Sequence, residues 1–377
     1  MGEQQFRVWC LLGRKAGDNT QVRALAGALG WGFDEKQIRA RPWELLVHAL
    51  PAPTLAGIDR GESSALTPPW PDLVISAGRR NEPVAQWIRA QSGGQTRLVH
   101  LGRPWAPLAS WDLIITTPQY FLPQAANILH IRLPLHTPLR TPLRTPPAAE
   151  DTAQTDVWQA RFAALPRPWI AVLIGGDSGR FVFTRAKGER LGRLSQQLAQ
   201  AAGGALLVSD SPRTPSAVMQ GFAGRLGVPH AIYRCAAGGE NPYRAMLALA
   251  DAFVVTGESM SMLAEAADTK RPLFIFDPGD ADTPWWRLAH NYRYKPLSFR
   301  FAMRFGPPRM RRDVGRIQAG LMEAGKARWL DDQSVAGAGA ALDSLPGVVP
   351  CTDAAGDNAQ ADLAASVEAV RRLLIRP

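Results

Sequence analysis

The sequence predicts an α/β protein built from two Rossmann-like, doubly wound domains. Short apolar segments alternate with segments of helical periodicity in both halves of the chain, and polar loops rich in glycine or serine follow several apolar segments. This alternation is typical of parallel sheets covered by helices on both faces. At 377 residues the chain is long for one domain, and with 46% hydrophobic residues it can bury two cores.

The first half contains the clearest alternation. Strands are expected over residues 6–12, 72–76, 97–101 and 112–116, and helices over residues 19–29 and 82–91. The first helix is supported by apolar residues at helical spacing, namely Val22, Leu25, Ala26 and Leu29. His100 stands near the end of one strand, and His130 is expected to open another.

Prolines and threonines crowd residues 134–155, which predicts an extended linker. A second alternating block runs from Trp169 to about Phe276. The expected parts are an N-terminal domain (1–150), a linker (151–168), a C-terminal domain (169–330), and a flexible loop with a terminal helix that packs back (331–377). This terminal helix is amphipathic, with one apolar stripe formed by Leu363, Val367, Val370 and Leu374.

Residues 251–266, DAFVVTGESMSMLAEA, carry the strongest functional signal. The apolar run stops at Thr256, and we expect a buried strand that turns at Gly257 into a helix N-capped by Ser259. Because the first turn of a helix exposes free N–H groups, such a start attracts anions, above all phosphate. Glu265 lies on the same helix, within reach of a sugar hydroxyl if a nucleotide binds there. An ordinary capped turn is the alternative.

Two further strand ends in the second half have the same character. Residues 169–174 run into Gly175-Gly176-Asp177-Ser178, and residues 205–208 run into Ser209-Asp210-Ser211-Pro212-Arg213. Glycines let a ligand approach the main chain, and exposed N–H groups can form an anion nest. In a parallel sheet these loops meet at the carboxyl edge, where open α/β sheets bind ligands.

The loops of the first half exclude some functions and suggest others. Gly13-Arg14-Lys15-Ala16-Gly17-Asp18-Asn19 matches neither Gly-x-Gly-x-x-Gly nor the P-loop, because Lys15 precedes Gly17. Dehydrogenase and ATPase functions therefore lose their best support. Ser76-Ala77-Gly78-Arg79-Arg80 follows another strand, and two arginines beside a glycine turn suit a phosphate or carboxylate. The structural alternative is that Asp18 or Asn19 caps the helix and the basic residues are solvated.

Two histidines are candidate general bases. His100 or His130 could accept a hydroxyl proton, since a neutral imidazole exists near pH 7. A histidine at a strand end is nevertheless more often structural. No histidine, cysteine or carboxylate cluster has metal-ligand spacing, so no metal is expected. No cofactor is expected either, because a nucleotide sugar bound here would be a substrate.

The net charge of +10 favours anionic partners. Between Arg287 and Arg316, nine basic residues accompany one acidic residue, Asp313, and aromatic residues are interleaved. This pattern fits an anionic membrane surface, single-stranded nucleic acid, or a solvated basic face. No run approaches the roughly 18 apolar residues of a transmembrane helix. We expect no signal peptide, and three scattered cysteines fit a reducing cytosol, so the predicted localisation is cytoplasmic.

Six strings together resemble the plant "elongated mitochondria" fission-factor family and its bacterial homologues, a group within the GT-B glycosyltransferase-like superfamily. They cover residues 13–21, 75–80, 173–176, 209–215, 241–243 and 254–266. Thr256-Gly257-Glu258 departs from the alanine–aspartate pair that family members often carry. The resemblance implies two domains facing across a cleft, with a nucleotide-sugar site that needs no metal. The composition, rich in arginine, alanine and proline, looks bacterial.

The leading hypothesis is a glycosyltransferase-like enzyme of bacterial envelope metabolism that uses a nucleotide-diphosphate sugar. The expected nucleotide-sugar residues are Gly175, Gly176, Asp177, Ser178, Ser209, Ser211, Arg213, Thr256, Gly257, Glu258, Ser259, Met260, Ser261 and Glu265. The expected acceptor-side residues are Gly13, Arg14, Lys15, Gly17, Asn19, Ser76, Gly78, Arg79 and Arg80. Arg213 would neutralise the departing diphosphate, and Asp18 or His100 would deprotonate the acceptor.

Two alternatives remain open. One is a nucleotide-sugar epimerase of GT-B fold, and the other is a non-catalytic, membrane-associated scaffold. The expected partners are a nucleotide sugar and an anionic membrane surface, contacted through residues 287–316 at the inner membrane. No nucleic-acid partner is expected.

Overall fold

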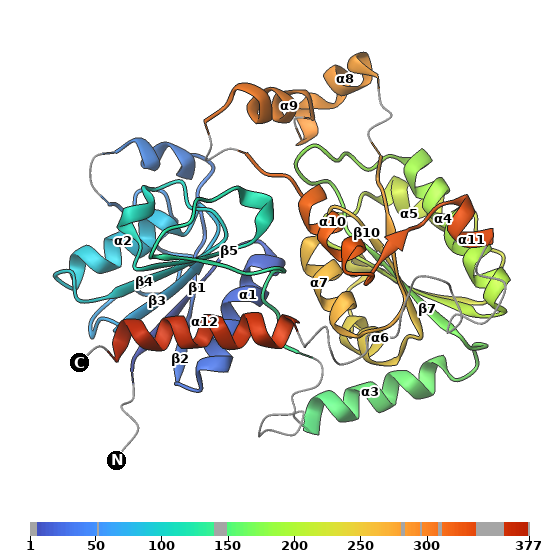
Figure 1. Ribbon diagram of the computed structural model, residues 1–377, viewed down its shortest axis with the longest axis horizontal. Coiled ribbons are helices and arrows are strands. Elements are labelled where there is room, and N and C mark those ends of the chain that lie inside the picture. The colour runs from blue at the N-terminus through green and yellow to red at the C-terminus, as the bar shows by residue number, and fades with distance from the viewer. Residues whose placement is uncertain are drawn as a thin grey trace. The chain divides into compact units, whose positions relative to one another are not determined.

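The computed structural model describes residues 6–50, 53–138, 149–279, 283–294, 296–307, 311–336 and 358–375. The chain divides into two compact units. Unit 1 consists of residues 1–137, 311–313 and 356–377, and unit 2 consists of residues 138–310 and 314–355. Each unit contains one six-stranded parallel sheet with helices on its faces, which confirms the prediction of two doubly wound α/β domains (Figure 1).

The sheet of unit 1 has the strand order β2-β1-β3-β4-β5-β6. Its strands are β1 (Val8–Leu12), β2 (Phe33–Gln37), β3 (Leu73–Ala77), β4 (Arg97–Leu101), β5 (Leu113–Thr116) and β6 (Ile128–His130). Its helices are α1 (Ala16–Leu29), α2 (Glu82–Gln91) and α12 (Asn358–Leu374), with short 3-10 turns at Glu44–Ala49, Leu108–Ser110 and Pro118–Tyr120. Because β2 and β3 lie on opposite sides of β1, the topological switch point falls between β1 and β3.

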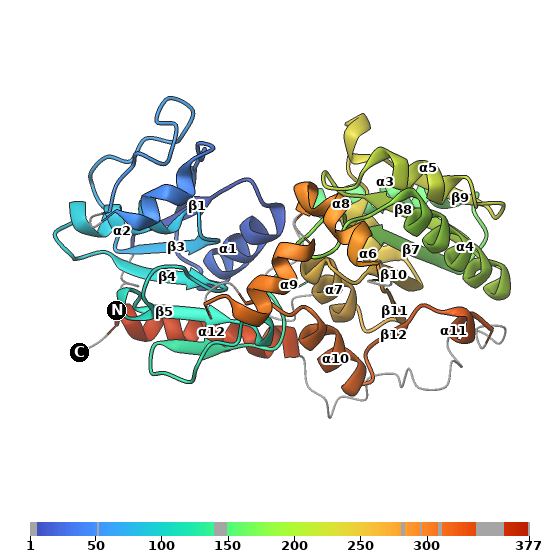
Figure 2. The same cartoon turned by 90° about the horizontal axis from the view of Figure 1, so that it is seen from above.

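Strand β1 shows why these segments are apolar at every position. Val8, Cys10 and Leu12 face α1 and α12, whereas Trp9 and Leu11 face α2, so both faces of the strand are buried. Helix α12 packs on this sheet through the stripe that the sequence predicts, with Val370 fully buried, and Figure 2 shows it beside β5. The last helix of the chain therefore completes the core of unit 1.

The sheet of unit 2 has the order β12-β11-β10-β7-β8-β9. Its strands are β7 (Trp169–Ile174), β8 (Ala205–Asp210), β9 (His230–Tyr233), β10 (Ala252–Thr256), β11 (Leu273–Phe276) and β12 (Arg328–Trp329). Its helices are α3 (Ala149–Phe162), α4 (Arg185–Ala202), α5 (Ser216–Ala223), α6 (Tyr243–Leu249), α7 (Met260–Asp268), α8 (Pro284–Tyr294), α9 (Pro296–Phe305), α10 (Gly315–Glu323) and α11 (Asp332–Ala336), with a 3-10 turn at Cys235–Ala237. The switch point of this sheet lies between β7 and β10.

Three local expectations differ from the structure or lie outside it. The segment 151–168, expected as a linker, is helical as far as Phe162. The end of this helix is packed in the protein, because Phe162 is buried, its ring lies 5.5 Å from that of Trp158 in a tilted arrangement, and it meets Trp169 edge-on at 5.9 Å. His130 ends β6 and does not open a strand, and its Nε2 lies 3.1 Å from the Pro123 carbonyl oxygen. Most of the expected loop at 334–360 lies outside the described residues.

Candidate functional site

Three polar strand ends meet at the carboxyl edge of the unit 2 sheet, as the sequence predicts. They follow the adjacent strands β10, β7 and β8, and together we call residues 175–178, 209–214 and 256–262 the strand-end corner. The Gly175 amide donates to Thr256 Oγ1 at 2.8 Å, and the Gly176 amide donates to Glu258 Oε1 at 2.8 Å. The Thr214 hydroxyl donates to the Gly175 carbonyl oxygen. Direct hydrogen bonds therefore lock the three loops together at the switch point.

The glycine pair in this corner is required by packing. A Cβ atom at Gly175 would lie 1.9 Å from Glu258 Oε1, and one at Gly176 would lie 2.2 Å from the carbonyl oxygen of Arg213. Both amides already have protein acceptors. The expectation that the amides of Gly175 and Gly176 form a free anion nest is therefore wrong.

Glu258 acts as a structural group inside the corner. Its residue is only 2% exposed, and burial raises the pKa of its carboxyl group, an effect that the nearby charge of Arg213 opposes. Oε1 accepts the Gly176 amide, whereas Oε2 has no hydrogen-bond partner in the described part of the chain. A ligand contact was expected at Glu258, but this side chain is committed to holding the β7 loop.

The remaining polar residues of the β7 and β8 loops are also bonded within the protein. Asp177 Oδ1 accepts the Phe183 amide at 2.7 Å, and the Ser178 amide donates to the Phe181 carbonyl oxygen at 2.9 Å. Ser209 is 1% exposed within β8, so it cannot present its hydroxyl at the edge. The hydroxyl of Ser211 lies 3.1 Å from that of Thr214. The structure places these predicted residues together but uses them to shape the loops.

The start of α7 remains available to an anion. Ser259 occupies the N-cap position without a side-chain capping bond, and its amide donates to the Thr256 carbonyl oxygen at 3.1 Å. The next three amides, those of Met260, Ser261 and Met262, have no acceptor among the described residues. Ser261 and Met262 are half-buried, whereas Ser259 and Met260 are buried.

Gly257, at the turn between β10 and α7, makes a contact with α10 that the sequence does not predict. The Gln318 side chain on α10 donates to the Gly257 carbonyl oxygen at 2.6 Å. A Cβ atom at Gly257 would lie 2.6 Å from Gln318 Nε2, so a side chain at position 257 would push the end of the Gln318 side chain aside and break this hydrogen bond. The Gly257 amide also has a partner, since it donates to the Phe276 carbonyl oxygen at 2.8 Å.

Arg213 and Glu265 lie beside this helix start. Arg213 is exposed, and its Nη1 donates to the Asp177 carbonyl oxygen at 3.2 Å. The half-buried carboxylate of Glu265 accepts a hydrogen bond from the Tyr243 hydroxyl. Sequence reasoning did not include Tyr243 among the candidate site residues, although the string Asn241-Pro242-Tyr243 was part of the family resemblance. It fixes the side chain that we expect to meet a sugar hydroxyl.

The loops after β1 and β3 meet at the switch point of unit 1. Asn19 closes the first loop, because its side chain exchanges two hydrogen bonds of 2.9 Å with the main chain of Gly13. Asp18 is 31% exposed, and Lys15 Nζ lies 3.8 Å from Asp18 Oδ2. Gly78 has a φ of +73°, and a Cβ atom there would lie 2.7 Å from Asp18 Oδ2. The candidate base Asp18 is thus held beside the β3 turn.

His100 and Ser76 do not reach this edge. His100 is fully buried, its Nδ1 lies 3.2 Å from Ser76 Oγ, and its ring lies 4.6 Å from that of Trp111. Burial lowers the pKa of His100 to about 3. A general base must reach its substrate, so the structure favours Asp18 over His100 for that role. Ser76, expected on the acceptor side, is also a core residue.

The two arginines after β3 have different environments. Arg80 Nε lies 2.6 Å from Glu44 Oε1, which ties Arg80 to a buried carboxylate. Arg79 is stacked over the Trp105 ring at 4.6 Å. Of the two, Arg79 is therefore the better placed to bind an anion.

The basic segment 287–316 is split between the units. Helix α9 in unit 2 exposes Leu297, Phe301 and Phe305, and the last two are 65% and 69% exposed. Arg311 and Arg312 belong to unit 1, where Arg312 Nε donates to Gln119 Oε1 at 3.0 Å. The candidate membrane-binding surface is therefore restricted to α8 and α9 of unit 2, and does not include the whole segment 287–316.

The described residues include neither a membrane-spanning helix nor a metal-binding group of side chains. None of their helices combines the length and apolar character needed to cross a bilayer. No three histidine, cysteine, aspartate or glutamate side chains in that part of the chain are grouped so that they could hold a metal ion.

Solved structures with a similar overall fold have low sequence identity to this chain. One is Arabidopsis thaliana UGT89C1 complexed with UDP, at 10% identity and a TM-score of 0.47, covering 97% of this chain and 99% of that one. Another is UDP-GlcNAc 2-epimerase from Neisseria meningitidis bound to UDP-GlcNAc, at 11% identity and a TM-score of 0.41, covering 84% and 99%. Both TM-scores are below 0.5, so neither likeness carries a function to this chain.

Comparison by sequence identifies the family of this chain. The mitochondrial fission protein ELM1 of Arabidopsis thaliana is 27% identical over 236 residues, which cover 58% of this chain and 54% of the plant protein. The match thus spans about half the length of that relative. The family described as mitochondrial fission ELM1 matches residues 16–293, most of the chain. The chain therefore belongs to the mitochondrial fission ELM1 family.

Proposed function

We propose that the chain binds a nucleotide-diphosphate sugar at the strand-end corner and transfers the sugar to an acceptor held by unit 1. One observation carries this proposal: at the switch point of a parallel sheet, the amides of Met260, Ser261 and Met262 have no acceptor among the described residues. The positive end of the helix dipole adds to their attraction for an anion. A diphosphate would therefore gain charge-assisted hydrogen bonds there.

The neighbouring side chains supply the remaining roles. Arg213 would neutralise the charge that grows on the diphosphate as its bond to the anomeric carbon breaks. Glu265, positioned by Tyr243, would accept hydrogen bonds from ribose hydroxyls. Asp18 would take the proton of the acceptor hydroxyl, whose oxygen forms the new bond to the anomeric carbon.

The proposal extends to the place of action. We assign the acceptor to envelope glycan or glycolipid metabolism of a bacterium, at the cytoplasmic face of the inner membrane. Leu297, Phe301 and Phe305 recur every four residues on α9, and Arg300 and Arg304 are exposed beside them. An apolar stripe flanked by arginines suits a helix that lies in an anionic membrane interface.

Calorimetric titration of the full chain with UDP, GDP and their sugars tests the donor. We expect one of these nucleotides to bind, and Arg213→Gln to weaken binding about tenfold or more, because a charge-assisted hydrogen bond is worth about 1.5–3 kcal/mol. Arg225→Gln is the matched control, since it removes an exposed arginine that follows the end of α5 and pairs with Glu189 at 3.2 Å. Failure of every nucleotide to bind would refute the donor assignment.

A non-catalytic scaffold is the second candidate function. Its support is that the amides of Gly175 and Gly176 are satisfied without any ligand, so the corner does not need a nucleotide to keep its shape. The relative named as a mitochondrial fission protein fits this alternative. A folded Arg213→Ala variant that fully complements a deletion strain would favour the scaffold, whereas loss of complementation would favour catalysis.

A further inference from the structure

The carboxyl edge of the unit 1 sheet is lined with cations. Arg14 and Lys15 follow β1, Arg79 and Arg80 follow β3, and Arg103 follows β4. The loop after β5 contributes a fourth position, because residues 311–313 are tethered to Gln119 there. Arg312 Nε donates to Gln119 Oε1 at 3.0 Å, and the Asp313 amide donates to the Gln119 carbonyl oxygen at 2.9 Å. Four adjacent strands thus bring positive charge to one edge.

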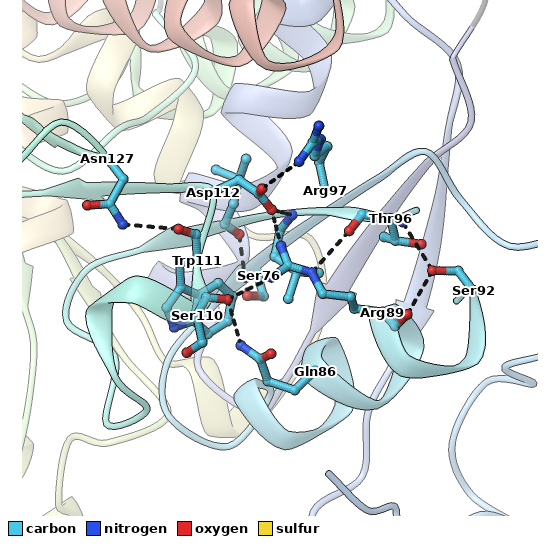
Figure 3. Close-up of polar contacts among 12 residues, drawn as sticks. Ser76, Gln86, Arg89, Ser92, Thr96, Arg97, Ser110, Trp111, Asp112 and Asn127 are labelled. Atoms are coloured by element: carbon cyan, nitrogen blue, oxygen red, sulfur yellow. Dashed lines mark hydrogen bonds and ion pairs between the residues drawn. The ribbon is translucent and has the colours of Figure 1, made fainter. Parts of the chain in front are cut away.

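At the opposite edge of the same sheet, the arginines are paired with a carboxylate. Arg89 and Arg97 both pair with Asp112, which also accepts the Leu98 amide at 2.7 Å (Figure 3). Arg89 further donates to the carbonyl oxygens of Thr96 and Ser110. Both of these arginines are paired with a carboxylate of the protein itself.

Three carboxylates near this edge already have partners within the protein. Glu44 pairs with Arg80, and Asp18 lies 3.8 Å from Lys15. Glu82, although close to Arg79, accepts the amides of Trp105 and Ala106 at 2.8–2.9 Å. Among the described residues, Arg79, Arg103 and Arg311 have no ion pair.

Arg103 and Arg311 are held partly buried with donors to spare. Arg103 Nη1 donates to the Tyr120 carbonyl oxygen, but the Nε atoms of Arg103 and Arg311 are buried and have no acceptor in the described part of the chain. Burial lowers the pKa of Arg103, and the nearby charge of Arg311 lowers it further. Two like charges at close range favour a bound anion, and the Nη atoms, which are not among the buried unpartnered atoms, are the donors that an anion can reach.

We propose that Arg103 and Arg311 bind the phosphate of a phosphomonoester, which identifies the acceptor of the proposed transfer as a phosphorylated compound. The identification as acceptor rests on the proposed function, whereas the phosphate site does not. Guanidinium forks match phosphate oxygens in pairs, and a phosphomonoester carries about two negative charges near neutral pH. The phosphate could belong to a lipid headgroup or to a soluble ester, and both present the same group.

Titration of the full chain with glycerol 1-phosphate tests the site directly. We expect Arg103→Gln and Arg311→Gln each to weaken binding about tenfold or more, and Arg103→Lys to retain part of it. Arg60→Gln is the charge-matched control, because Arg60 is exposed on unit 1 and no ion pair involves it among the described residues. Circular dichroism confirms that each variant is folded.

A second titration separates this inference from the proposed function. UDP binding should be weakened by Arg213→Gln and unchanged by Arg103→Gln, while glycerol 1-phosphate should show the reverse. Vesicles of phosphatidylcholine with and without phosphatidic acid form the lipid arm, and dependence on Arg103 in either arm supports the site and identifies the source. If both probes bind the Arg103 and Arg311 variants as tightly as the wild type, the inference is wrong, whatever UDP does.

Discussion

Substitution of Gly176 by alanine tests whether the strand-end corner is packed as described. The added methyl group would lie 2.2 Å from the Arg213 carbonyl oxygen, and real Cβ contacts do not fall below 3.0 Å, so the β7 and β8 loops must separate by at least 0.8 Å. Overpacking of this kind costs about 1–3 kcal/mol, and loss of the bond from the Gly176 amide to Glu258 adds about 1 kcal/mol. We therefore expect Gly176→Ala to lower the free energy of unfolding by about 2–4 kcal/mol.

Urea unfolding followed by circular dichroism measures this change without any ligand. Gly320→Ala is the matched control, because Gly320 lies inside α10 and its Cβ atom would meet nothing within 4 Å. Alanine there should stabilise unit 2 by about 1 kcal/mol. If the glycine pair instead serves the approach of a ligand, Gly176→Ala will be as stable as the wild type and will lose only nucleotide affinity. That outcome would refute the packing described here.

Three further predictions concern single contacts. The pKa of Glu82 is raised from 4.5 to about 7, mainly by burial, so the stability it contributes is complete below 4.5 and is lost as the pH rises through 7. In urea unfolding, the free energy of unfolding of Glu82→Gln should rise relative to that of the wild type by about 3 kcal/mol between about pH 5 and about pH 8. A difference between the two proteins that does not change with pH would contradict the raised pKa. Tyr243→Phe should weaken UDP binding by about 1 kcal/mol in calorimetry because it frees the Glu265 carboxylate, and unchanged affinity would remove Glu265 from the site. Phe301→Ser should weaken co-sedimentation with phosphatidylglycerol vesicles about tenfold or more, because it removes an exposed aromatic side chain from α9. Leu46→Ser, at a position 72% exposed on unit 1, should leave co-sedimentation unchanged. If the two variants bind vesicles equally well, α9 is not the membrane-binding helix.

Buried strands could be located from the sequence to within two residues, because their apolar runs have a single interpretation. Strands β4 and β7 have the expected bounds, and β10 extends the expected run only by Thr256. Strand β2 could not be found in this way, since its residues Phe33–Gln37 are mostly exposed and largely charged. It exists through main-chain pairing with β1, which leaves no pattern in the side chains.

The candidate site was predicted in position but not in detail. Topology alone brings the loops after β7, β8 and β10 together, so their meeting follows from the alternation of elements. The partners of individual groups depend on tertiary approach: Gln318 reaches Gly257 from α10, 61 residues away, and Glu258 reaches back to Gly176 across 82. No local spacing encodes such contacts. Burial is likewise not encoded locally: His100, predicted to lie at the sheet edge, is a core residue.

In the proposed function, the first turn of α7 binds the diphosphate through its amides. The chain contains eight methionines, and two of them, Met260 and Met262, lie in that turn. Labelling the methionine amides with nitrogen-15 and adding UDP therefore reports on the turn directly, with Met322 on α10 as an internal reference. We predict that the Met260 and Met262 signals shift on titration while the Met322 signal does not. Binding of UDP that leaves the signals of Met260 and Met262 unmoved would contradict the claim.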